Sequence, residues 1–194
     1  MSGPAGAGGL IWKIPAVGGR EDALVIRKGR MVLKDLPREV LHLQMQAAVE
    51  NLRKNRMDAY LVSRKEDVVP QVRALLHAGD SVAVGGSETL KESGVLELLR
   101  SGDYQFIDRY APGLTPEQVR RVFLDSLSAD AYLCSANAVT MRGELYNVDG
   151  NGNRVAALCY GPASVIVVAG RNKLVSDLDE AVSRVKRMAA PANA

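Results

Sequence analysis

The sequence predicts an α/β protein with a mostly parallel sheet flanked by helices and a small β-hairpin insertion. Apolar runs of about six residues, suited to strands, alternate with helix-patterned runs of about a dozen residues. Such alternation is typical of parallel sheets whose strands are joined by right-handed helical crossovers. The run 164–169 (SVIVVA) is apolar behind a single serine, which indicates a central strand covered on both faces.

Helices are predicted where apolar residues recur at spacings of three and four. Proline and glycine set several helix ends: Pro37 fits a first turn, Pro70 delays the second helix to near Val69, and Gly79 ends it. The predicted helices run over residues 36–57, 69–78, 88–100, 117–127, 155–160 and 176–190.

Strands are predicted at the short apolar runs between these helices. Residues 139–141 and 145–148 flank Gly143 and Glu144, which predicts the β-hairpin. The other predicted strands run over residues 58–63, 81–84, 104–107, 129–134 and 164–169.

Residues 1–30 differ in composition from the rest of the chain. Residues 2–9 are rich in Gly and Ala, and the apolar patches 10–14 and 23–26 are suited to docking as short strands. We therefore expect a flexible or strand-docking N-terminal extension over residues 1–30 and the main domain over residues 31–194.

Composition excludes several functional classes. The 194 residues are 47% hydrophobic and 24% charged, as in a globular domain, and the net charge of +3 arises from basic residues interleaved with acidic ones, which argues against a nucleic-acid partner. No run suits a membrane span, and residues 1–24 lack a signal-peptide pattern. Cys134 and Cys159 lie in apolar surroundings, typical of buried thiols in a reducing cytosol, so we expect a cytoplasmic protein without a metal site.

Ligands of such folds bind beyond the carboxyl ends of the strands, and one candidate segment there is 83–90 (AVGGSETL). Its glycines allow close approach of the backbone to a phosphate, carboxylate or carbonyl oxygen, and its hydroxyl groups add donors. The alternative is a tight turn capped by Ser87. The candidate ligand-binding residues are Gly85, Gly86, Ser87 and Thr89.

The second candidate segment spans residues 135–162 and is rich in Asn, Asp, Gly and Arg. Arg154 falls in a predicted first helical turn, where a cation is unfavourable by roughly 0.3–1 kcal/mol, so we expect it to hold a carboxylate from Asp149, Glu144 or a ligand. The alternative is a hairpin whose polar turn caps a helix. The candidate ligand-binding residues are Asn137, Asn147, Asp149, Gly150, Asn153 and Arg154.

A third polar segment, 170–174, places Arg171 and Lys173 after the strand 164–169, with a solvated turn as the alternative. No Ser–His–Asp or Cys–His arrangement is evident. If the protein is an enzyme, its acid and base groups are expected among Glu144, Asp149 and Glu88; the residues identify no cofactor and no reaction.

The run from residue 135 to 194, together with MQAAVENLRKNRMDAYLV, VAVGGSETLKESGVLELLR and FIDRY, resembles the LUD (lactate-utilisation) family, close to its lactate-utilisation protein C branch. The resemblance implies the fold shared by ribose-5-phosphate isomerase, glucosamine-6-phosphate deaminase and the coenzyme A transferases. In those relatives a glycine-rich turn binds phosphate or a cofactor, which falls here on Gly85, Gly86, Ser87 and Thr89. The isomerase's catalytic acids have no clear counterpart in this sequence.

The resemblance also implies a role in oxidising L-lactate to pyruvate alongside iron–sulfur partner proteins. The function it favours is binding of a small anionic metabolite at the carboxyl edge of the sheet. The alternative is a non-catalytic assembly partner of an iron–sulfur lactate-oxidising complex, and a second copy of the chain is a further candidate partner.

Overall fold

A six-stranded sheet lies at the centre of the computed structural model, which describes residues 9–14 and 36–193. Its strand order is β2-β1-β8-β5-β3-β4. Neighbours among β8, β5, β3 and β4 run parallel, whereas β1 is antiparallel to both of its neighbours, so the predicted mostly parallel α/β fold is confirmed. The strands are β1 (Gly9–Ile14), β2 (Asp58–Val62), β3 (Ser81–Val84), β4 (Gln105–Ile107), β5 (Ala131–Cys134) and β8 (Ser164–Gly170).

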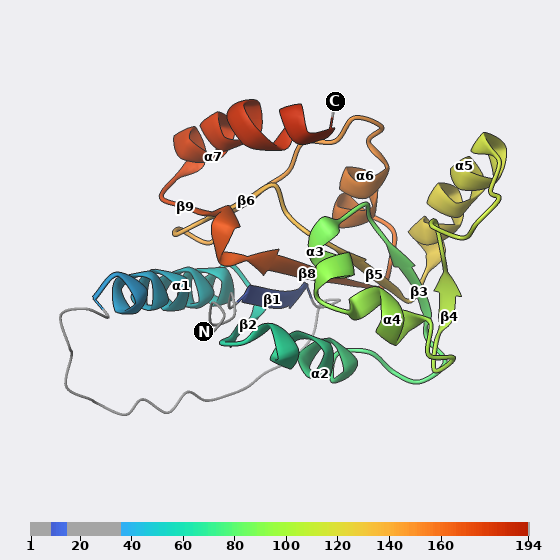
Figure 1. Cartoon of the computed structure of the whole chain (residues 1–194), viewed down its shortest axis with the longest axis horizontal. Helices are drawn as coiled ribbons and strands as arrows, with labels where there is room; N and C mark the ends of the chain where they lie inside the picture. The colour runs from blue at the N-terminus through green and yellow to red at the C-terminus, as the bar shows by residue number, and fades with distance from the viewer. Residues whose placement is uncertain (1–8, 15–35, 194) are drawn as a thin grey trace, which may run out of the picture.

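Helices cover both faces of this sheet (Figure 1). Side chains of β5 alternate between the two layers: Tyr132 and Cys134 pack with one core cluster, Ala131 and Leu133 with the other. The first cluster includes α1 (Leu36–Lys54) and α6 (Asn153–Cys159). The second includes α2 (Val68–Arg73), α3 (Glu88–Glu92) and α4 (Val95–Leu99). Two further helices are α5 (Pro116–Asp125) and α7 (Leu178–Arg184).

A second, three-stranded sheet contains the predicted hairpin. Its strands β6 (Ala138–Thr140) and β7 (Leu145–Tyr146) pair antiparallel, and β9 (Leu174–Val175) joins β6 in parallel. The sequence did not predict β9, because two residues are too short for a periodic signal. The hairpin turn abuts α1, since Asn55 Nδ2 donates to the carbonyl oxygen of Gly143 at 2.9 Å.

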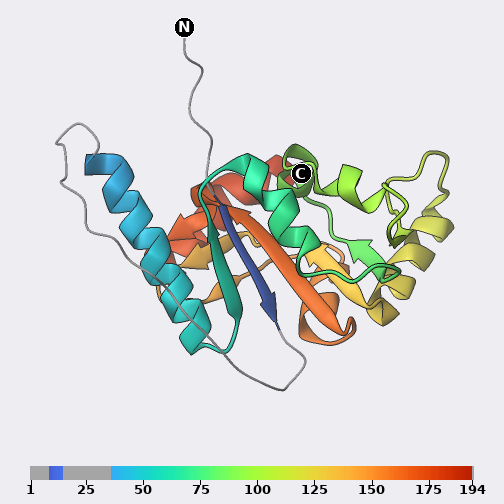
Figure 2. The same cartoon turned by 90° about the horizontal axis from the view of Figure 1, so that it is seen from below.

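Strand β1 lies between β2 and β8, which Figure 2 shows side by side with it. It covers the first of the two apolar patches that the sequence singled out in its N-terminal region. The second patch, 23–26, lies outside the described residues.

Four expectations about elements and burial were wrong. The predicted helix 69–78 ends at Arg73, and turn residues lead from there to Gly79. The predicted helix 88–100 is two helices, because Gly94 adopts a left-handed φ of +78° between them. The predicted helix 176–190 begins as α7 and continues as a wider π-helical segment, Val185–Ala189. Cys159, the last residue of α6, is exposed, and Ala157 is the buried residue of that helix; Cys134 is buried as expected. No helix within the described ranges is long and apolar enough to cross a membrane.

Candidate functional site

A cleft of about 720 Å³ lies at the carboxyl edge of the main sheet. Each of the four parallel strands is followed by a residue that lines it: Arg109 after β4, Ser87 after β3, Ser135 after β5 and Lys173 after β8. The loop before α6 and the segment from the end of α7 to residue 192 complete the walls. The cleft therefore collects residues that are far apart in the sequence.

Most of the predicted site residues line this cleft. From the first segment these are Gly86, Ser87 and the candidate acid Glu88. Ser87 also caps α3, because its Oγ accepts from the backbone N–H of Leu90 at 3.3 Å. The second segment contributes Asn137, Asp149, Gly150, Asn153 and Arg154.

Four predicted residues do not line the cleft. Gly85 lies behind it, where a Cβ would stand 3.0 Å from the Tyr132 hydroxyl. Thr89 and Asn147 accept hydrogen bonds from cleft-lining residues, at 3.3 Å from Lys173 Nζ and 3.0 Å from Arg154 Nη1. Glu144 stands in the hairpin turn, where its carboxylate accepts from the Thr140 hydroxyl.

Arg154 is the hub of the second segment. Its Nη1 donates to the Ser135 carbonyl oxygen at 2.8 Å and to Asn147; its Nη2 donates to Asn137 Oδ1 and the Val148 carbonyl oxygen, both at 2.7 Å. All four acceptors are neutral. The predicted ion pair with Asp149 or Glu144 is absent from the ion pairs of the described residues.

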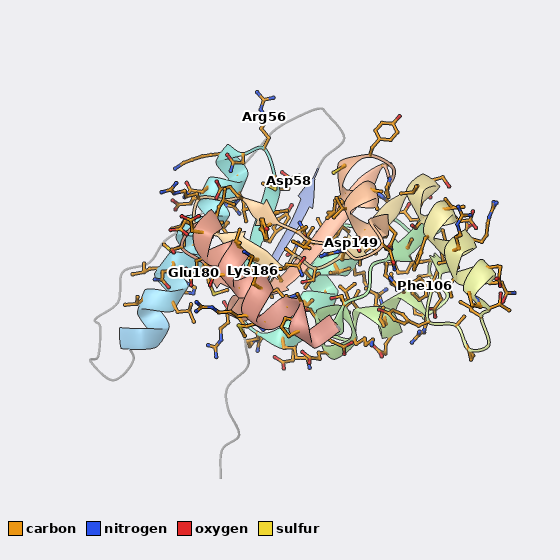
Figure 3. All side chains as sticks on the ribbon, turned by 90° about the horizontal axis from the view of Figure 1, so that it is seen from above. Arg56, Asp58, Phe106, Asp149, Glu180 and Lys186 are labelled. Atoms are coloured by element: carbon orange, nitrogen blue, oxygen red, sulfur yellow. The ribbon has the colours of Figure 1, made fainter. Side chains whose placement is uncertain are left out.

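Asp149 instead caps α6. Its Oδ2 accepts from the backbone N–H groups of Arg154 at 2.7 Å and Val155 at 3.2 Å, and its Oδ1 accepts from Asn151. Partial burial raises the pKa of Asp149, but these backbone hydrogen bonds and the charge of Arg154 outweigh it, so the pKa lies below its ordinary value. Figure 3 shows Asp149 on the loop between β7 and α6, and Lys186 on the helical segment that includes cleft-lining Val185.

Lys173 is a half-buried residue of the cleft lining. Its Nζ donates to Ser135 Oγ at 2.5 Å and to Thr89 Oγ1 at 3.3 Å. Burial, followed by the charges of Arg184 and Arg154, lowers the pKa of Lys173 to about 8. Lys173 lies after a strand, as the sequence predicts. The alternative of a solvated turn does not fit Lys173, because two hydroxyl groups accept hydrogen bonds from its amine.

The cleft is also lined by two arginines that the sequence analysis did not single out. The Arg109 guanidinium stacks on Phe123, with 4.8 Å between its Cζ and the ring centroid, and lies beside Gly86. Arg184 donates to the carbonyl oxygens of Asn137 and Asn172. Arg109 follows a predicted strand, and that position could have identified it as a candidate site residue. Arg184 lies within a helix, where no sequence pattern indicates a site.

The charges of the cleft do not balance. Arg109, Arg154, Lys173 and Arg184 line it, and none of these cations takes part in an ion pair within the described part of the chain. Its two carboxylates are engaged elsewhere: Asp149 caps α6, and Glu88 pairs with Lys91 at 2.7 Å. The arrangement can hold an anion without breaking an internal ion pair.

A protein-family model described as the LUD domain matches residues 45–194. Neither the curated proteins nor the solved structures include a match to this chain.

Proposed function

Because the chain belongs to the LUD domain family, we propose that it acts in L-lactate utilisation and holds a small anionic metabolite in the cleft. The observation that carries this proposal is the set of four cleft-lining cations without an ion-pair partner among the described residues. The family assignment supports a role in L-lactate utilisation, and the cations of the cleft support an anionic ligand.

Charge and burial favour an anionic ligand over a neutral one. Burying an ammonium group without an opposite charge is unfavourable, as the lowered pKa of Lys173 indicates. A bound carboxylate or phosphate supplies the missing charge. Because the guanidinium of Arg154 is already fixed by neutral acceptors, little conformational freedom remains to be lost on binding.

The size of the cleft determines which anions to test. Six heavy atoms of lactate, at roughly 30 Å³ each, fill less than about 200 Å³. The cleft of about 720 Å³ falls within the range of sites that hold larger metabolites. Sugar phosphates and coenzyme A therefore belong in the panel with L-lactate and pyruvate.

Thermal unfolding with this panel tests the proposal. An anion present at about 100 times its Kd should raise the Tm by about 5–10 °C, because it binds only the folded state. Lys173→Met should reduce that shift, and Lys65→Met, which changes an exposed lysine outside the cleft, should leave it unchanged. Lactamide, which lacks the charge of lactate, should give no shift.

The absence of a shift across the whole panel would contradict ligand binding. It would favour the alternative, a non-catalytic assembly partner of an iron–sulfur lactate-oxidising complex. That alternative predicts co-purification with iron–sulfur subunits in place of a small-molecule effect.

A further inference from the structure

Ser135 and Lys173 meet at the floor of the cleft. The 2.5 Å between Lys173 Nζ and Ser135 Oγ is a direct hydrogen bond, and both residues line the cleft. Thr89 Oγ1 accepts a second hydrogen bond from the same amine at 3.3 Å. The amine is therefore oriented by one hydroxyl group while it faces another.

This geometry is that of an activated nucleophile. A hydroxyl within hydrogen-bond reach of a base, with the base oriented by a third group, is the arrangement that serine enzymes share, and lysine serves as the base in some of them. Of the two hydroxyl groups on Lys173, that of Ser135 belongs to a cleft-lining residue, whereas Thr89 does not line the cleft. Ser135 is thus the nucleophile and Thr89 the orienting group.

The surroundings of Lys173 favour the neutral form of its amine, which can accept a proton. Its burial and the nearby arginines lower its pKa to about 8, so an appreciable neutral fraction exists near neutral pH. Lys91 shows the contrast on the same protein: its hydrogen bond to Glu88 raises its pKa. The pKa values differ in direction because Lys91 has a carboxylate partner, whereas Lys173 is partly buried beside Arg184 and Arg154.

Cations also line the cleft in which an acyl oxygen would develop negative charge. Arg154 Nη1 donates to the carbonyl oxygen of Ser135 at 2.8 Å, and Arg109 and Arg184 line the same cleft. Fixed cations stabilise the negative charge that develops on an acyl oxygen. They also select acyl donors that carry an anionic group.

We propose that Ser135 and Lys173 form a nucleophile–base pair that accepts an acyl group from an anionic ester or thioester bound in the cleft. The proposal rests on the anion-binding function proposed above. The neutral Lys173 amine takes the Ser135 hydroxyl proton as Oγ bonds to the acyl carbon. The bond from that carbon to the leaving oxygen or sulfur breaks, and the leaving group departs as an anion or takes the proton from Lys173. Water, or a second acceptor, then releases the acyl group from Ser135.

The test uses the full chain and the mono-p-nitrophenyl ester of succinate, which is activated and anionic. Wild-type protein should release p-nitrophenolate in a burst and gain the mass of a succinyl group, mapped to Ser135 by peptide mass spectrometry. Ser135→Ala should abolish the adduct. Lys173→Arg keeps the positive charge but cannot act as a base, and it should slow acylation by about a hundredfold or more.

Two further measurements make the outcome decisive. Acylation of wild-type protein should accelerate as pH rises through about 8, where Lys173 becomes neutral, and this step should vanish in Lys173→Arg. Ser128→Ala and Lys65→Arg change exposed residues that do not line the cleft, and they should react like wild type. Circular dichroism of each variant excludes loss of folding as the cause.

The proposal and the anion-binding function fail in different ways. Wild-type protein that binds anions in the thermal assay but shows no adduct, or an adduct elsewhere than Ser135, overturns the nucleophile–base pair and leaves anion binding intact. An adduct on Ser135 that forms equally fast in Lys173→Arg overturns the role of Lys173 as base.

Discussion

Arg154 illustrates how one residue can organise a site without an ion pair. Its guanidinium joins the end of β5, through the Ser135 carbonyl oxygen and Asn137, to the loop after β7, through Asn147 and Val148. Because all its acceptors are neutral, no internal anion neutralises the charge of Arg154, and this charge can attract an anion in the cleft. Its structural role and its proposed ligand-binding role therefore coincide in one side chain.

Arg154→Ala should lower the free energy of unfolding by about 2–4 kcal/mol, because it leaves several partly buried acceptors without their donor. Urea denaturation measures this change. Arg142→Ala, at an exposed position on the hairpin, should cost no more than about 0.5 kcal/mol. Equal effects of the two substitutions would contradict the role of Arg154 as a hub.

The proton of Lys173 should make stability depend on pH. Its pKa is about 8 in the folded protein and near 10.5 in the unfolded chain, so between these values the unfolded state binds more protons. The free energy of unfolding of wild type should therefore rise relative to Lys173→Met by about 3 kcal/mol as pH increases across this window. Denaturation of both proteins from about pH 7 to about pH 10 checks this, and a constant difference would show that the pKa of Lys173 is not displaced.

At the scale of elements, the hairpin is fixed to α1 by close backbone contact. Gly143 adopts a φ of +83° in the turn, and a Cβ there would stand 2.5 Å from the backbone of Asn51. Asn51 Nδ2 donates to the carbonyl oxygen of Met141 at 2.8 Å, which adds a hydrogen bond beside the contact. The turn thus requires glycine for conformation and for space.

Three glycine substitutions separate these two requirements. Gly143→Ala should cost about 2–4 kcal/mol, because it combines a left-handed φ with a backbone clash. Gly102→Ala, with a φ of +97° and open space around it, should cost about 1–2 kcal/mol. Gly150→Ala has open space and an ordinary φ, so it should change stability by no more than about 1 kcal/mol. Thermal or urea unfolding ranks the three, and a Gly143→Ala cost equal to that of Gly102→Ala would refute the clash.

The sequence predicted the order and type of most elements because strand and helix periodicities are local. It missed the break at Gly94, since apolar residues continue at helical spacing through that position. The cleft-edge position of Ser87 and Asp149 followed from their place in segments after predicted parallel strands. The contact of Lys173 with Ser135 did not, because it joins two strands whose side-chain directions are set by tertiary packing.

At the scale of the whole molecule, the cleft depends on the assembly of four parallel strands. Arg109 follows β4 and Lys173 follows β8, while Arg154 and Arg184 come from helices. The four cations come from separate segments of the chain, and the fold brings them together. This explains why a chain with a net charge of only +3 has a cationic site.

Anion affinity should accordingly fall as salt concentration rises. Raising ionic strength from about 0.01 M to about 1 M shortens the Debye length from about 30 Å to about 3 Å, so the Kd for pyruvate should rise by about threefold to tenfold. Pyruvamide, without the negative charge, should show no comparable change. Titration calorimetry at the two salt concentrations checks this, and a salt-independent Kd for pyruvate would contradict recognition by charge.

Strand β1 has a consequence for biosynthesis. It pairs with β8 along its length, Gly9 opposite Gly170 and Ile14 opposite Val165, so the sheet cannot be completed until both strands have left the ribosome. At about 5–20 residues per second, translation of the roughly 150 intervening residues takes about 10–30 s. During that interval the nascent chain carries β1 without its partner β8, and an unpaired strand edge of this kind invites association with other chains. Completion of the sheet is thus timed by translation, and chaperone occupancy on the nascent chain should end when β8 emerges.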